Sequence, residues 1–308
     1  MFIINNKKTF LIIAGTIAAL ALSAIAFLGV NFGIEFTGGS MLQVSYEEGS
    51  VPSFEKVESA VKAVDPDRSF ILQEAGEAGY IIRTRALDEE GRADLIGALT
   101  FNGFEAQEER FSSIGPSIGA ELANKAIVAI ILVVTAIILF IAYVFRRVSK
   151  PVSSWKYGTT AILALMFDIL IPVGLFAVLG FILGAEIDVL FVTALLAILG
   201  FSVNDTIVVF DRIRENLRIN EEYQIKKDFS QTVGESLEQT YVRSINTSLT
   251  TLFVLGTLFF IGPEVTQFFA LVLMTGVIAG TYSSLFLASP ILVTLEEIQR
   301  NKGQKKET

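Results

Sequence analysis

The residue whose chemistry most needs an explanation is Asp205, an acidic side chain within an apolar stretch. It lies between Asn204 and Thr206 in the segment FSVNDTIVVFDRIREN, Phe201 to Asn216, which ends in a cluster of charges. An ionised side chain deep in a membrane costs roughly 2.5–3.5 kcal/mol, so it needs a partner or a path to water. Asp205 is therefore a candidate for carrying a proton. The structural alternative is an interhelical hydrogen bond that holds the helices together.

Arg243 opens the next apolar stretch and is followed by polar residues at helical spacing. Asn246, Thr247 and Thr250 come three, four and seven residues later, so they share one face of a helix. Antiparallel neighbouring helices would bring Arg243 close to Asp205. The alternative for Arg243 is that its long side chain reaches from a helix end to the lipid headgroups.

Asp168 is a second carboxylate in an apolar stretch, four residues before Pro172. Proline weakens the backbone hydrogen bonding of a helix, which leaves room for polar contacts. The sequence leaves a structural and a proton-relay role for Asp168 equally open. Gly276 and Gly280 form a GxxxG pair, which favours close helix packing.

The composition excludes several other kinds of chemistry. The chain has no histidine and no cysteine, so histidine relays, thiol nucleophiles and disulfides are excluded. It has no GxxxxGK[ST] phosphate-binding loop for ATP. With 52% hydrophobic and 18% charged residues, it is typical of an integral membrane protein. We therefore expect no enzyme activity and no cofactor, and any proton must be carried by a carboxylate.

Six long apolar segments predict six transmembrane helices. The first, Thr9–Val30, has 22 residues without a charge, enough to cross a hydrocarbon core of about 30 Å. A cleavable signal peptide is the alternative for this segment, because Ala24-Ile25-Ala26 resembles a cleavage site. The other five segments are Ala126–Phe145, Tyr157–Ala185, Val189–Phe210, Ser244–Pro263 and Val265–Leu295.

Residues 31–123, between the first two apolar segments, predict a separate α+β domain. This stretch has 17 acidic and 7 basic residues, as expected of a soluble surface. Its hydrophobic periodicity predicts the order βαββαβ of a ferredoxin-like fold. The expected strands are Met41–Tyr46, Phe70–Gln73, Tyr80–Thr84 and Phe104–Phe111, and the expected helices are Ser53–Val64 and Glu89–Leu99.

The positions of lysine and arginine predict the orientation. They gather at Lys7 and Lys8, in the loops Arg146–Lys156 and Arg212–Lys227, and in the tail Arg300–Lys306. All of these fall on one side if the six segments alternate. We therefore expect residues 1–30 to form the cytoplasmic N-terminus and first helix, 31–123 an extracytoplasmic domain, 124–295 five further helices, and 296–308 a cytoplasmic tail. The end of that tail, from residue 301 on, is expected to be disordered.

Four motifs follow one another in an order known from one family. They are GIEFTGGS at Gly33–Ser40, GPSIGAEL at Gly115–Leu122, GFSVNDTIVVFDRIREN at Gly200–Asn216 and RSINTSLTT at Arg243–Thr251. Together they resemble the SecF branch of the SecD/SecF family of protein-export membrane proteins, within the RND superfamily. The resemblance covers essentially the whole chain.

The resemblance implies a six-helix RND half-unit in the bacterial inner membrane that works with SecD and the SecYEG channel. The family is understood to use the proton-motive force to help a translocating, unfolded preprotein across the lipid bilayer, and nucleic acid has no part in this. The resemblance implies proton-coupling roles for Asp205 and Arg243. Asn204, Asn246, Thr247 and Asp168 are further candidates, named for their positions among the polar residues of the membrane segments.

Two positions depart from the family pattern. Glu35 stands where GIDFTGG is more common, which keeps the charge, and Phe167 stands where relatives often have histidine, which makes a relay role for Asp168 less secure. Two other functions stay open at this point. They are an RND-type exporter of a lipid or small hydrophobic molecule, and a passive scaffold for SecD and the channel. The sequence leaves open whether the coupling ion is H⁺ or Na⁺.

Overall fold

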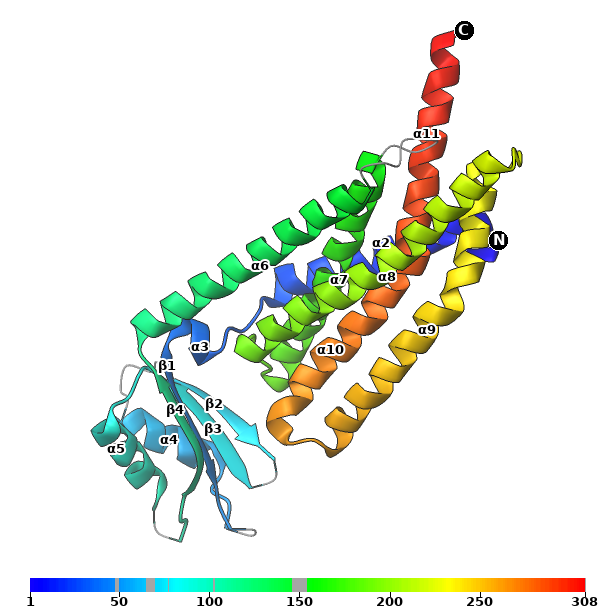
Figure 1. The fold of residues 1–308 in the computed structure, drawn as a ribbon. Helices are drawn as coiled ribbons and strands as arrows, with labels where there is room; N and C mark the ends of the chain where they lie inside the picture. The colour runs from blue at the N-terminus through cyan, green and yellow to red at the C-terminus, as the bar shows by residue number, and fades with distance from the viewer. Residues whose placement is uncertain (48–49, 65–69, 77, 102, 146–153, 308) are drawn as a thin grey trace. The chain divides into compact units, whose positions relative to one another are not determined.

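The computed structural model describes residues 1–47, 50–64, 70–76, 78–101, 103–145 and 154–307 (Figure 1). The chain forms two compact units. A helical unit contains Met1–Val30, Ala129–Ala185 and Leu190–Thr308, and an α+β unit contains Asn31–Val128 with the short segment Glu186–Val189. Most of the basic loop Arg146–Lys156, used above to predict orientation, lies outside the described residues.

The helical unit confirms the prediction of six membrane-spanning segments. Six helical stretches of the described chain are long and apolar enough to cross a membrane. Four of them extend well beyond the predicted segments into charged sequence, because these flanking residues continue the same helices. The helices are α1 (Phe2–Asn5), α2 (Lys7–Leu28), α6 (Pro116–Phe145), α7 (Ser154–Leu183), α8 (Val189–Glu222), α9 (Phe229–Ile261), α10 (Glu264–Tyr282) and α11 (Ser289–Glu307).

The last membrane segment contains a π-helical turn that the sequence does not predict. This turn, η1, covers Ser283–Ala288 and joins α10 to α11 without a break (Figure 1). Helix α11 then continues to Glu307, so the expectation of a disordered tail from residue 301 is wrong. The physical reason is that Glu, Gln and Lys are good helix formers and extend a helix that is already nucleated in the membrane segment.

Aromatic and small side chains build the core of the helical unit. The rings of Phe145 and Tyr157 stack with centroids 5.4 Å apart, and Phe210 meets both rings edge-on. At a second contact, between α10 and α8, a Cβ added to Gly276 would lie 2.2 Å from Ile198 Cδ1. This GxxxG glycine therefore lets α10 approach α8 closely.

The α+β unit has the predicted ferredoxin-like fold. Its four strands pair antiparallel in the order β2-β3-β1-β4, and two helices pack against each other on the chain's βαββαβ path (Figure 1). The predicted boundaries are close except for the last strand, which begins at Gln107 rather than Phe104. The elements are α3 (Ile34–Thr37), β1 (Gly39–Ser45), α4 (Phe54–Val64), β2 (Ile71–Ala75), β3 (Gly79–Thr84), α5 (Glu89–Leu99) and β4 (Gln107–Ile114).

Apolar side chains of the sheet and the two helices form a separate core in this unit. Leu42, Val44, Ile82, Val57 and Leu99 are almost completely buried. Because successive strand residues point to opposite faces, Leu42 and Val44 on β1 and Ile82 on β3 place their side chains on the helix-covered face. The unit therefore has its own hydrophobic core.

The two glycine motifs of the α+β unit pack against each other. Gly38 has φ 73°, and a Cβ at this position would lie 2.8 Å from Pro116 Cα. A Cβ at Gly119 would lie 2.7 Å from the backbone nitrogen of Gly38. The motifs GIEFTGGS and GPSIGAEL thus form one tight backbone contact at the start of β1 and of α6, which only glycine permits.

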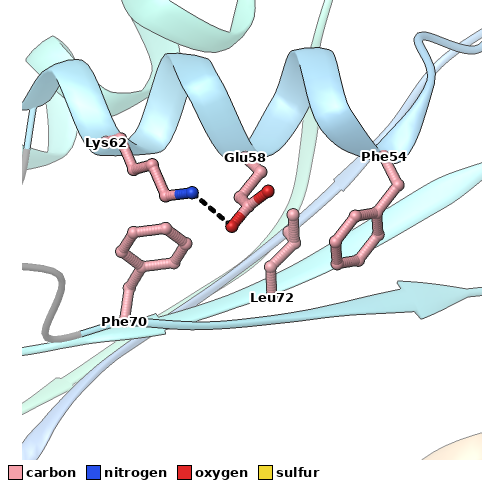
Figure 2. Close-up of a pocket in the computed structure, with 5 residues that line it drawn as sticks. All are labelled: Phe54, Glu58, Lys62, Phe70 and Leu72. Carbon is pink, nitrogen blue, oxygen red and sulfur yellow. Dashed lines mark hydrogen bonds and ion pairs between the residues drawn. The ribbon is translucent and has the colours of Figure 1, made fainter.

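A pocket of about 240 Å³ opens beside the edge strand of the sheet, between that strand and α4 (Figure 2). Phe54 and Leu72 line one end and Phe70 the other, and the Lys62 ammonium donates to Glu58 at 2.5 Å above them. None of the residues predicted to carry protons lines this pocket.

Candidate functional site

Asp205 lies on α8 with its carboxylate inside the helical unit. Its exposed fraction is 6%, and its Oδ1 accepts a hydrogen bond from Ser244 of α9 at 3.0 Å. The other oxygen, Oδ2, is buried and has no hydrogen-bond partner among the described residues. The carboxylate is therefore only partly satisfied, and it could accept a further donor or hold a proton.

Arg243 precedes Ser244 but lies on another face of α9. Its side chain is exposed, and no ion pair within 4.0 Å joins it to Asp205 in the part of the chain that the structure describes. Asn246, Thr247 and the neighbouring Asn204 of α8 are exposed as well. The structure therefore places the Ser244 hydroxyl in direct contact with Asp205, while Arg243 lies close enough to act on this carboxylate electrostatically without an ion pair. The polar line of α9, formed by Arg243, Asn246 and Thr247, is exposed on the surface of this chain.

Asp168 on α7 is completely buried. The hydroxyl of Ser202 on α8 donates to its Oδ2, while its Oδ1 has no hydrogen-bond partner among the described residues. Ser283, the first residue of the π-helical turn, interacts with the same carboxylate. Asp168 thus contacts α8 through Ser202, and Asp205 lies on the same helix about one turn further along.

Hydroxyl groups around the two carboxylates were not singled out from the sequence. Thr206 and Ser284 lie 2.8 Å apart, and Ser248 and Thr281 lie 2.5 Å apart. The signal that could have revealed them is spacing, because Ser202 and Thr206 flank Asp205 on one face of α8, and Ser244 and Ser248 share a face of α9. The first pair connects α8 with η1, and the second connects α9 with the end of α10.

A third carboxylate, half-buried, lies in the α+β unit at the loop that joins α7 to α8. Arg83 Nε of β3 lies 2.7 Å from Oε1 of Glu186, whose side chain is 18% exposed. Burial raises the pKa of Glu186 to about 7, the nearby Arg83 lowers it, and the carboxylates of Glu35 and Asp188 raise it further. Backbone hydrogen bonds also attach this loop to the start of the unit, since Ile187 pairs with Phe32 in a parallel bridge.

Metal chemistry has no obvious place in this arrangement. Within the described residues there is no group of three or more acidic side chains arranged to hold a metal ion, and the sequence has no histidine or cysteine. The titratable groups buried in the membrane helices are the carboxylates of Asp168 and Asp205, each hydrogen-bonded to a serine hydroxyl.

Comparison with protein-family models identifies the chain. Residues 96–298 match the model described as "Protein export membrane protein SecD/SecF, C-terminal", and residues 23–49 match the SecD/SecF GG motif. The chain belongs to the SecD/SecF family. The GG motif match contains Gly38 and Gly39, and the larger match contains Asp168, Asp205 and Arg243. The family expected from the four motifs is therefore confirmed.

Relatives along nearly the full length support this assignment. The chain is 41% identical over 300 residues to protein translocase subunit SecF of Thermobaculum terrenum, covering 93% of this chain and 89% of that protein. It is 34% identical over 288 residues to the protein of the same name from Desulfurispirillum indicum, covering 91% of this chain and 87% of that protein.

Solved structures show the same architecture. The crystal structure of SecDF from Thermus thermophilus, described as a translocon-associated membrane protein, matches with a TM-score of 0.80 and 28% identity. A second structure, SecDF in a super-membrane-facing form, matches with a TM-score of 0.68. The first match covers 96% of this chain and 38% of the SecDF chain. This chain therefore corresponds to a little over a third of that larger protein.

Proposed function

We propose that this chain is the SecF-type subunit of the bacterial Sec protein-export machinery, and that Asp205 couples the proton-motive force to its work. Family membership and the SecF relatives support the first part. The observation that carries the second part is the buried, half-satisfied carboxylate of Asp205. A carboxylate that binds a proton gains a donor and loses its charge, so both its hydrogen bonds and its attraction for a cation change.

The proposed switch lies between α8 and α9. Ionised Asp205 attracts the guanidinium of Arg243, and neutral Asp205 does not. Arg243 and Ser244 are adjacent, so a rotation of α9 by about 100° exchanges one for the other in front of Asp205. One proton moving through 100 mV supplies about 2.3 kcal/mol, which is comparable to the cost of an ionised side chain in the membrane. The proton gradient is therefore sufficient for the exchange.

The exposed polar line of α9 is the proposed contact with SecD. Arg243, Asn246 and Thr247 are exposed on a membrane-spanning helix, and polar groups facing lipid are costly. The SecDF structures contain a chain more than twice as long as this one, which supports a SecD half as the partner. SecD polar groups would then satisfy those of α9.

The remaining partners follow from the proposed orientation. Both termini lie in the cytoplasm, because the basic segments lie on that side, and the α+β unit lies outside, close to the SecYEG channel. There, the edge strand β2 and the pocket beside it (Figure 2) can receive an extended preprotein segment by strand addition, with an apolar side chain between Phe54 and Leu72.

The test is a pulse-chase of a signal-bearing precursor in cells that lack this subunit. They are rescued with the wild-type chain, Asp205→Asn or Arg243→Met at matched membrane levels. We expect both variants to assemble with SecD and to leave precursor unprocessed, because each removes one half of the charge switch. Asp211→Asn is the matched control, since Asp211 lies on the same helix but is exposed and pairs with Arg214 at 3.7 Å.

Normal processing with both variants would contradict proton coupling through this pair. In that case the chain acts as a passive scaffold for SecD and the channel. Dissipating the proton gradient in the wild-type strain should reproduce the Asp205→Asn defect, whereas dissipating a sodium gradient should not.

A further inference from the structure

The hydroxyl groups around Asp168 are arranged for a protonated carboxyl group. Ser202 donates to Oδ2, and Oδ1 has no hydrogen-bond donor among the described residues. The hydroxyl of Ser283, which lies beside this carboxylate, donates to the backbone carbonyl of Gly280 at 3.1 Å. An ionised Oδ1 would then remain buried without a donor, which is costly.

A proton on Oδ1 removes the cost of a buried, ionised oxygen without a donor. The new O–H can donate to the oxygen of Ser283, whose own proton is already engaged with Gly280. The result is a continuous chain from Ser202 through Asp168 and Ser283 to Gly280, in which each hydroxyl donates once. The orientation of Ser283 therefore fits the neutral form of Asp168.

Among the described residues, no cation compensates for a charge on Asp168. The elements around it, in their described parts, bring the phenol of Tyr282 at the end of α10 and the carboxylate of Asp205 on α8. The charged residues of α2, α6 and α11 lie outside the apolar segments of these helices, where Lys7 pairs with Glu297 and Lys125 with Glu121. An isolated carboxylate without a cation in a membrane core is most stable when it carries a proton.

The π-helical turn links this group to the surroundings of Asp205. Ser283 and Ser284 are its first two residues; Ser283 interacts with Asp168, and Ser284 lies 2.8 Å from Thr206, the residue after Asp205. A π-helical turn inserts an extra residue into a helix and occurs frequently at functional sites. Close approach of α10 is possible because position 280 is glycine, where a Cβ would lie 3.0 Å from Ser202.

We propose that Asp168 is a second proton-binding site of this chain, held by Ser202 and Ser283 and linked to Asp205 through the π-helical turn. Binding forms one O–H bond at Oδ1 and breaks none within the protein. Release of the proton leaves a carboxylate that requires Ser283 to turn from Gly280 toward Oδ1. That rotation changes the junction of α10 and η1, on which the contact between Ser284 and Thr206 depends. The proposal deepens the proposed function by adding a second protonation step to it.

The test is infrared difference spectroscopy of the full chain assembled with its partner subunit in lipid nanodiscs at neutral pH. We expect a carbonyl band of a protonated carboxyl group that is absent from Asp168→Asn and retained in Asp205→Asn. Ser283→Ala should shift the band to higher frequency, because the acid O–H loses its acceptor. Thr275→Val is the matched control, since the Thr275 hydroxyl bonds only to the Leu271 carbonyl of its own helix and should leave the band unchanged.

A spectrum of Asp168→Asn identical to that of the wild type would overturn the proposal. So would loss of the band on adding sodium ions at constant pH, because the site would then bind a cation in place of a proton. If Asp168→Asn fails to assemble, the Ser283→Ala shift decides the question. These readouts do not depend on export, so they can fail while Asp205→Asn still abolishes export, and the reverse also holds.

Discussion

Asp205 and Asp168 are buried carboxylates and Glu186 is a half-buried one, and their partners differ. The two in the membrane helices have serine hydroxyls as their donors, Ser244 for Asp205 and Ser202 for Asp168. Glu186, in the loop outside the helices, has the guanidinium of Arg83 at 2.7 Å. Hydroxyls can donate or accept, whereas a guanidinium only donates. The first two sites therefore suit proton exchange. At the third, ionisation of Glu186 costs desolvation that the pairing with Arg83 offsets only in part.

The pH dependence of the Glu186 contact follows from its raised pKa. The pKa is about 7 in the folded chain against an ordinary value of 4.5, so the folded state binds more protons between these pH values. The stability contributed by Glu186 is therefore complete below pH 4.5 and is lost as pH rises through 7, up to about 3 kcal/mol. We expect the amide protons of Gly33 and Ile187 to exchange more readily, after correction for intrinsic rates, at pH 8 than at pH 5.

Glu186→Gln should remove this dependence on pH in the full-length chain, because glutamine does not titrate. Glu105→Gln is the control, since Glu105 is an exposed carboxylate in the same unit. Hydrogen exchange measured by mass spectrometry gives the comparison. Equal pH dependence in wild type and Glu186→Gln would show that another group controls this loop.

At the level of secondary-structure elements, small residues allow whole helices to pack closely against each other. Helix α10 meets α8 through Gly276 and Gly280, and the π-helical turn follows directly after this contact. In a membrane, helices associate through close van der Waals packing and hydrogen bonds, since lipid is as apolar as the helix surface. The glycine pair thus allows Ser202 to pack against Gly280 of α10 and Thr206 to contact Ser284 of the π-helical turn.

Gly276→Ala should destabilise the helical unit. Its Cβ would lie 2.2 Å from Ile198 Cδ1 and 2.7 Å from Ile198 Cγ2, so the whole side chain must shift, at a cost of about 1–3 kcal/mol. Gly256→Ala, on α9, has no atom within 4 Å of the added Cβ and should be neutral or slightly stabilising. Thermal unfolding in detergent measures both, and equal melting temperatures would contradict the close contact of α8 and α10.

The whole molecule consists of two units with separate cores. In the helical unit, the polar line of α9 remains exposed. The α+β unit takes in the loop Glu186–Val189, so the connection between α7 and α8 belongs to it in structure. On the helical unit, Arg243, Asn246 and Thr247 remain exposed. A membrane protein with an exposed polar helix face is incomplete without a partner that covers it.

Asn246→Leu should weaken assembly with the SecD subunit. The amide of Asn246 makes no hydrogen bond among the described residues, so its loss costs this chain nothing by itself. An interhelical hydrogen bond in a membrane is worth about 1 kcal/mol, which corresponds to roughly fivefold in association. Co-purification of the two subunits after detergent extraction, at limiting protein concentration, measures this loss of association. Ile245→Leu, at an exposed apolar position of the same helix, is the control, and equal recovery of both variants would place the SecD contact elsewhere.

The sequence by itself determined the class of protein, the six membrane segments and the ferredoxin-like order of the α+β unit, and it predicted a role for Asp205. These follow from hydrophobic periodicity, from the cost of a charge in an apolar segment, and from motifs that are local in the chain. The tertiary structure decided which groups meet. It placed Ser244 instead of Arg243 on Asp205, and Ser202 on Asp168. Helix rotation and a π-helical turn set those contacts, and both depend on packing between segments far apart in the sequence.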